Sequence, residues 1–168
     1  MPATYTLISS NVLSSSAASV TFSSIPSTYT DLVLRYSARV TSGTVENIQT
    51  TLNSATSGFS ETYLYGTGSA AVSGRGSAQS VLYAIYVNGG STTADTFTNG
   101  EFYIPSYTAS QNKCFNITGG LENNATLGRM FTTAALWSNT AAITSIKLEP
   151  FNSFVSGSSF FLYGISNA

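Results

Sequence analysis

Leu32-Val-Leu-Arg-Tyr-Ser-Ala-Arg-Val40 is the stretch that decides the fold. The side chains of Leu32, Leu34 and Tyr36 occupy every second position, and Arg35 and Arg39 fall between them. Side chains alternate between the two faces of a β-strand, so this period of two predicts a strand with one face in a core. Leu32, Leu34 and Tyr36 are therefore expected to point inward.

The same kind of short run recurs along the chain between turn signals. Ile48, Thr50 and Leu52 share one face of a second alternating run, and Ile146 and Leu148 are predicted to point inward from a third. Further runs are rich in the β-branched and aromatic residues that suit strands. We predict strands within residues 5–9, 18–25, 32–40, 46–53, 61–65, 81–87, 101–104, 113–118, 130–137, 143–149 and 159–165.

These runs amount to an all-β fold of about eight to ten antiparallel strands, at the spacing typical of a sandwich or barrel. Met130 to Trp137 is the run closest to a helical pattern. Residues 66–77, rich in Gly and Ser, are predicted to form a mobile surface loop. No segment resembles a linker, so residues 1–168 are expected to be one domain, with residues 1–4 as a short N-terminal arm.

The composition combines a substantial core with an unusually uncharged remainder. Hydrophobic residues make up 42% of the chain and charged residues only 8%, against about 25% charged in an ordinary globular protein. Ser and Thr supply most of the polarity, and they favour strands and turns over helices. A surface with so few charges is poorly protected against association, which indicates that part of it is covered in the working state.

Histidine is absent and Cys114 is the single cysteine. This removes Ser-His-Asp and Cys-His catalysis and the usual zinc sites. The scattered carboxylates contain no local signature of a glycosidase pair or a calcium loop. The sequence therefore predicts no enzyme, no catalytic or metal-binding residue and no cofactor, and it predicts Cys114 to be a small buried apolar residue.

The formal net charge of −1 provides no basic patch for nucleic acid. No apolar run approaches the roughly 20 residues of a membrane span. The start of the chain has neither the basic nor the apolar region of a signal peptide, which predicts a protein made in the cytoplasm.

Five residues are candidates for an interaction surface. Tyr63 and Tyr65 could form an aromatic platform for sugars or proteins, or could simply occupy strand positions. Arg35 and Arg39, on the polar face of one strand, could contact another subunit or be solvated. Arg75 lies in the Gly-rich segment, which lacks the Gly-Lys-Ser/Thr ending of a phosphate loop.

Two parts of the chain resemble a family of small structural proteins of tailed bacteriophages. The first runs from Thr4-Tyr-Thr-Leu-Ile-Ser-Ser to Asp31-Leu-Val-Leu-Arg35, and the second includes Trp137-Ser-Asn-Thr-Ala-Ala-Ile143 and continues to Phe160-Phe-Leu-Tyr-Gly-Ile165. Residues 45–127 lie outside the resemblance. It implies a virion protein with a jelly-roll-like sandwich, whose shared scaffold is a first hairpin and a last strand pair.

The resemblance and the residues together predict a capsid decoration or cement protein that binds and stabilises the phage head. Its expected partners are copies of itself, as a homotrimer, and the major capsid protein or another virion protein. The alternative is the head domain of a tail fibre or tailspike, which would bind glycan on the host cell.

Overall fold

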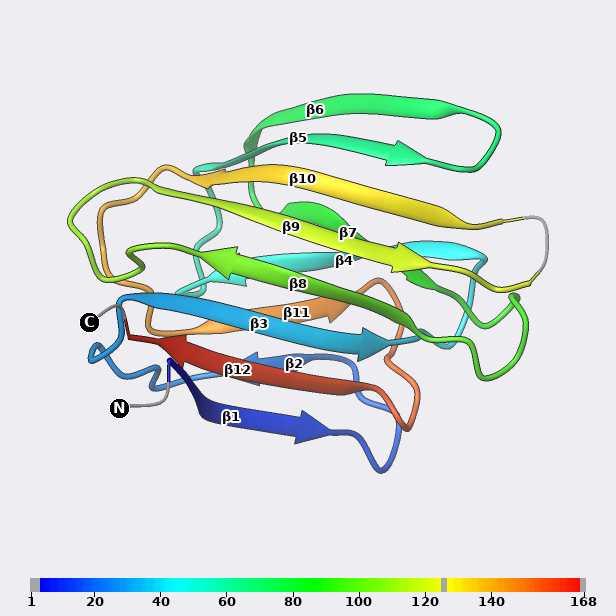
Figure 1. Cartoon of the computed structure of the whole chain (residues 1–168), viewed down its shortest axis with the longest axis horizontal. Coiled ribbons are helices and arrows are strands. Elements are labelled where there is room, and N and C mark those ends of the chain that lie inside the picture. Colours follow the sequence, from blue (N-terminus) through cyan, green and yellow to red (C-terminus); the bar gives the residue numbers. More distant parts are fainter. Residues whose placement is uncertain (1–3, 125–126, 167–168) are drawn as a thin grey trace.

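The structure, a computed structural model, describes residues 4–124 and 127–166, and every regular element in them is a β-strand (Figure 1). Twelve strands form two antiparallel sheets, which confirms the predicted all-β sandwich with more strands than the expected eight to ten. The strands are β1 (Tyr5–Val12), β2 (Val20–Phe22), β3 (Asp31–Ala38), β4 (Val45–Leu52), β5 (Phe59–Gly66), β6 (Ala71–Gln79), β7 (Leu82–Asn88), β8 (Thr98–Ile104), β9 (Lys113–Leu121), β10 (Arg129–Trp137), β11 (Ile146–Pro150) and β12 (Ser159–Ile165).

The strand order is that of a jelly roll widened on one side. The larger sheet has the order β1-β12-β3-β8-β9-β10-β5-β6, and the smaller sheet has the order β2-β11-β4-β7. Four nested antiparallel pairs wind the chain into the two sheets: β1 with β12, β2 with β11, β3 with β8, and β4 with β7. These eight strands are the two four-stranded sheets of a jelly roll. The expected first hairpin and last strand pair are both wrong, because β1 and β2 lie in different sheets and so do β11 and β12.

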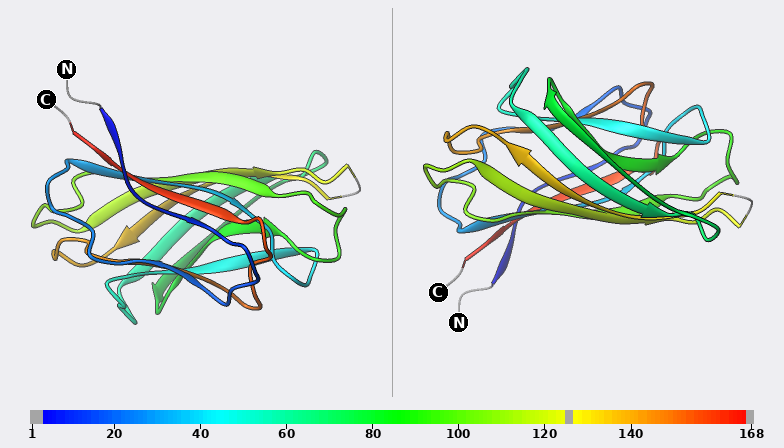
Figure 2. Two further views of the ribbon diagram at one scale, coloured as in Figure 1. Left: turned by 90° about the horizontal axis from the view of Figure 1, so that it is seen from below. Right: turned by 90° about the horizontal axis from the view of Figure 1, so that it is seen from above.

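Two inserted hairpins, β9–β10 and β5–β6, widen the larger sheet beyond β8. β9 pairs with β8, β10 pairs with both β9 and β5, and β6 forms the edge. We call these four strands the extension. Figure 2 shows the smaller sheet on one side of the larger sheet only, with β7 packed against β5, β9 and β10. Among the described residues, no second sheet therefore packs on the outer face of the larger sheet.

The core lies between the two sheets and follows the predicted alternation. Leu32, Leu34 and Tyr36 from β3, and Ile146 and Leu148 from β11, are at most 3% exposed, as expected. Large aromatic side chains pack among aliphatic ones in the rest of the space between the sheets, where burying each one contributes about 1.5–3 kcal/mol. Phe59 with Trp137 and Phe154 with Phe160 are two of the ring contacts there.

The Gly-rich segment predicted as a loop is a β-hairpin, and this prediction is wrong. Ala71–Gln79 forms β6 and pairs with β5 from Gly66↔Ala71 to Phe59↔Gln79. Gly74 faces the ring of Tyr63 so closely that a Cβ there would collide with the phenol. The small residue is needed for this close packing and does not signal an unpaired backbone.

Met130 to Trp137 belongs to β10, an inner strand of the extension, with none of the helical character considered for it. Phe131, Thr133, Ala135 and Trp137 are buried, and the residues between them are more exposed. Pairing with β9 on one side and β5 on the other satisfies the backbone along its whole length.

Cys114 is exposed, contrary to the prediction, because the neighbouring Lys113 takes the inward position. The Nζ of Lys113 donates hydrogen bonds to the carbonyl oxygens of Ala109 (2.7 Å), Gln111 (2.6 Å) and Thr140 (3.3 Å). These three carbonyls solvate the ammonium inside the protein, while burial lowers the pKa of Lys113. Since adjacent residues of a strand point to opposite faces, Cys114 faces solvent.

The ends of β1 and β12 lie side by side, with Tyr5 opposite Ile165. Of the predicted N-terminal arm, residues 1–3 lie outside the described residues, and the Thr4 carbonyl accepts a hydrogen bond from the Ser166 amide at 3.3 Å. The described part of the chain contains no helix that is long and apolar enough to cross a bilayer.

Candidate interaction surface

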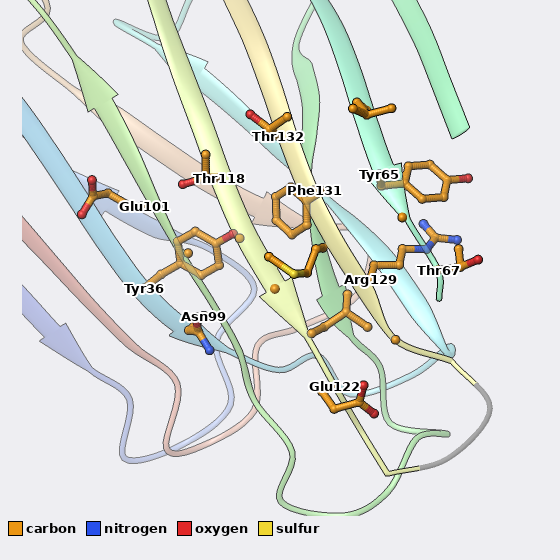
Figure 3. A pocket seen from close by; sticks show the side chains of 18 of the residues that line it. Tyr36, Tyr65, Thr67, Asn99, Glu101, Thr118, Glu122, Arg129, Phe131 and Thr132 are labelled. Carbon is orange, nitrogen blue, oxygen red and sulfur yellow. The ribbon is translucent and has the colours of Figure 1, made fainter. Parts of the chain in front are cut away.

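A broad groove of about 1520 Å³ lies over the outer face of the larger sheet. Its lining comes from β3, β8, β9, β10 and β5, together with the turn after β5. Figure 3 shows Glu101, Thr118 and Thr132 in one line across β8, β9 and β10, as their cross-strand pairing requires. Gly100, Gly119 and Gly120 line part of the groove as bare backbone. The groove therefore offers hydroxyl, amide and apolar contact groups.

Arg35 borders this groove and is held in place by neighbouring residues. Its Nε donates to Glu101 Oε2 at 2.8 Å, and the two side chains are 55% and 38% exposed. Its guanidinium also lies 5.6 Å from the ring centre of Tyr5 and 6.0 Å from that of Tyr163. The hydrogen bond to Glu101 raises the pKa of Arg35. Since an exposed pair contributes little stability, this outward arginine remains available for contact.

Tyr63 and Tyr65 point to the inner face of β5 and join an aromatic cluster. Their rings stack on each other at 6.2 Å, and both make edge contacts with Tyr86. The guanidinium of Arg129 lies 4.4 Å from the centre of the Tyr65 ring and 4.8 Å from that of Tyr86, and Figure 3 shows it beside Tyr65. The two tyrosines therefore join β5 to β7 and β10, and they do not form a platform on the outer face.

Arg39 lies inside the protein, so it is not part of an exposed interaction surface. β3 ends at Ala38, and Arg39 is 7% exposed. Its guanidinium donates to backbone carbonyls of Gly90, Thr92, Thr93 and Thr96, at distances from 2.8 to 3.4 Å. Its role in the structure is to order the connection between β7 and β8.

Arg75 is exposed on the edge strand β6 and points to the same outer face as Arg35. A small hollow beside it is also lined by Cys114, Ala134 and Leu136. Of the five candidate residues, the structure thus brings Arg35 and Arg75 to the outer face, places Tyr63 and Tyr65 on the inner face, and buries Arg39.

Two apolar side chains on the outer face were not among the candidates from sequence. Leu64 is 49% exposed and Met130 is 78% exposed, and both line the groove. The available signal was strand alternation: Leu64 lies between Tyr63 and Tyr65 in sequence and so must face away from both. That alternation could not show that Met130 lies on a neighbouring strand.

No match was found when the chain was compared with family models, curated proteins and solved structures.

Proposed function

We propose that this chain is a structural protein of a tailed-bacteriophage particle, and that it decorates and stabilises the capsid. The proposal combines the resemblance of its two ends to small phage structural proteins with the surface that the fold leaves uncovered.

The resembling segments pair with one another in the fold. They contribute β1, β2, most of β3, β11 and β12, and three of the strand pairs join these strands: β1 with β12, β2 with β11, and β12 with β3. A frame built from both ends of the chain is consistent with a scaffold that a family shares. The middle of the chain, outside the resemblance, supplies most of the extension.

The observation that carries the proposal is the uncovered outer face of the larger sheet. On the extension, the outward positions hold small, hydroxyl, amide and apolar side chains, and Arg75 is the one charged residue among them in the described strands. A broad sheet face with so little charge is suited to packing against another protein. A decoration protein needs such a face to bridge neighbouring shell subunits.

The proposed partners are copies of the chain itself, as the trimer that the resemblance implies, and the major capsid protein or another virion protein. Electron microscopy of purified particles, with an antibody against this chain, tests the location. Many labels over the head support capsid decoration. A few labels confined to the tail would contradict it.

The groove favours a second candidate, the head domain of a tail fibre or tailspike that binds host glycan. Thr118, Thr132 and Asn99 present hydroxyl and amide groups there, which are suited to hydrogen-bonding sugar hydroxyls. Binding of the purified chain to host cells or their polysaccharide tests this candidate. Saturable binding to the polysaccharide that the variant T118V/T132V abolishes would favour the glycan-binding tail protein.

A further inference from the structure

Four outward-facing residues form a straight diagonal across the extension. From Met130 on β10, the register leads across to Gly66 on β5 and two residues along to Leu64. The same step from Leu64 leads across to Ser73 on β6 and then to Arg75. The opposite step from Met130 leads across to Gly120 on β9 and then to Glu122.

The four positions are evenly spaced in an ideal sheet. Each step is one strand across and two residues along, about 8 Å for strands about 4.8 Å apart with a rise of about 3.3 Å per residue. Glu122 follows the last residue of β9, and its Oε2 would lie 2.8 Å from a Cβ on Gly128, which places its carboxylate at the expected next position. The diagonal therefore runs acid, apolar, apolar, base over about 25 Å.

The two ends of this diagonal carry charges without an ion-pair partner. The two ion pairs among the described residues are Arg35–Glu101 and Lys147–Glu149, so neither Arg75 nor Glu122 belongs to one. Glu122 Oε1 accepts two backbone amides, from Asn123 at 2.9 Å and Asn124 at 3.0 Å, which fix the carboxylate in place. Arg75 is exposed on its strand.

The centre of the diagonal is apolar and exposed. Leu64 and Met130 are 49% and 78% exposed, although the strands that carry them are otherwise regular and paired. An exposed apolar centre with charges at its edge is the arrangement of a protein interface, in which the centre loses water and the rim stays polar.

The pattern is complementary to itself. If the same face of a second copy is laid on this one with the diagonal reversed, Glu122 meets the second copy's Arg75 and Met130 meets the second copy's Leu64. A two-fold axis in the plane of the contact produces this arrangement and repeats every contact twice. Other proteins would need an unrelated matching surface, whereas a second copy already has one.

We propose that two copies of this chain associate face to face through their extensions, along the diagonal Glu122–Met130–Leu64–Arg75. This inference names the surface for the self-association in the proposed function and rests on that part of it. It differs from the implied trimer, because a reversed diagonal pairs two copies. A four-stranded face, about 19 Å wide from its strand spacing, is at the lower end of specific interfaces, so we expect a dissociation constant in the micromolar range.

Charge reversal of the full chain tests the proposal by sedimentation velocity over a range of protein concentrations. The wild-type protein should approach twice its monomer mass of 17.6 kDa as concentration rises. R75E and E122R should each raise the dissociation constant about tenfold or more, because two symmetry-related contacts change from attraction to repulsion. The double variant R75E/E122R restores opposite charges, and its dissociation constant should return to within about threefold of wild type.

The matched control is K147E/E149K, which exchanges the charges of an exposed ion pair on the smaller sheet and should leave the dimer unchanged. M130D should weaken the dimer while leaving the circular dichroism spectrum and melting temperature of the monomer near wild type, since Met130 is exposed. This separates loss of contact from loss of folding.

Three results would overturn the proposal. An oligomer that R75E does not weaken, or that the double variant does not restore, rules out the diagonal and leaves self-association standing. A trimer, even one that R75E weakens and the double variant restores, would also rule out the two-fold diagonal and leave self-association standing. A monomer at every concentration rules out the self-association in solution as well, while the location on the particle is still decided by microscopy.

Discussion

Removal of the Arg39 guanidinium should destabilise the protein and loosen the connection between β7 and β8. Arg39 is 7% exposed, and its Nη1 and Nη2 donate six hydrogen bonds to this connection. Four of the acceptors are backbone carbonyls, and no described carboxylate forms an ion pair with Arg39. The arginine therefore replaces water for a segment that has no regular secondary structure.

The expected loss follows from these contacts. A hydrogen bond to a charged group contributes about 1.5–3 kcal/mol, but six that share one guanidinium are far from additive. Much of the connection is exposed, so water can solvate the carbonyls again in the variant. We expect R39M to lower the free energy of unfolding by about 3 kcal/mol, which corresponds to a fall of about 6–12 °C in melting temperature for a domain of this size.

Urea unfolding followed by circular dichroism measures this loss, and R39K is the informative companion variant. An ammonium retains the charge with three donors, so R39K should lose about half as much as R39M. A loss below about 0.5 kcal/mol for R39M would refute the reasoning, because that is the ordinary effect of a surface substitution. Equal losses for the two variants would show that the ammonium of lysine replaces none of the hydrogen bonds of the guanidinium.

Four further predictions concern other buried or exposed groups. Burial raises the pKa of the Glu61 carboxyl above its ordinary value of 4.5. The protonated carboxyl therefore contributes its full stability below that pH, and this contribution is lost as pH rises through the pKa of the group in the folded protein. E61Q should therefore raise the melting temperature at neutral pH and flatten its dependence on pH above 4.5, as thermal melts across pH will show. Burial also raises the pKa of Tyr36, and it raises the pKa of Tyr86 to about 12. The protein should therefore unfold more easily as pH rises from about 10 through 12. A titration followed by tyrosine absorbance should show the phenols ionising as the structure is lost. The buried Tyr36 hydroxyl has no hydrogen-bond partner among the described residues, so Y36F should be neutral or slightly stabilising. Cys114 should react with a thiol reagent in the folded protein about as fast as in urea, and strong protection would contradict its exposed position.

Strand positions were predictable because one face of each strand contributes to a core. The period of two in residues 32–38 fixed which side chains point inward, and the same holds for Ile146 and Leu148. The alternation of apolar residues did not predict the strand where close packing requires glycine at an inward position. The sequence of β6 predicts a loop because its inward positions include Gly74, and only the cross-strand Tyr63 explains a glycine there.

The direction of single polar residues was harder to predict because it depends on contacts from distant parts of the chain. Lys113 is buried because carbonyls from two separate connections surround its ammonium. Arg39 was expected to share a face with Arg35, but β3 ends before it and the guanidinium turns inward to the β7–β8 connection. The groove and the diagonal lie on strands that are neighbours only after folding.

The structure also shows that the surface is less charged than the composition suggests. Of the six basic and seven acidic residues, Asp31, Arg39, Glu61 and Lys113 are buried. Four more form the two exposed ion pairs, and Arg129 is stacked on tyrosine rings. Among the described residues this leaves Glu46, Arg75, Asp95 and Glu122, and two of these four are the ends of the diagonal. Where a surface has so few unpaired charges, an acid and a base at opposite ends of one apolar line restrict how two copies can meet, because the parallel alignment would bring like charges together.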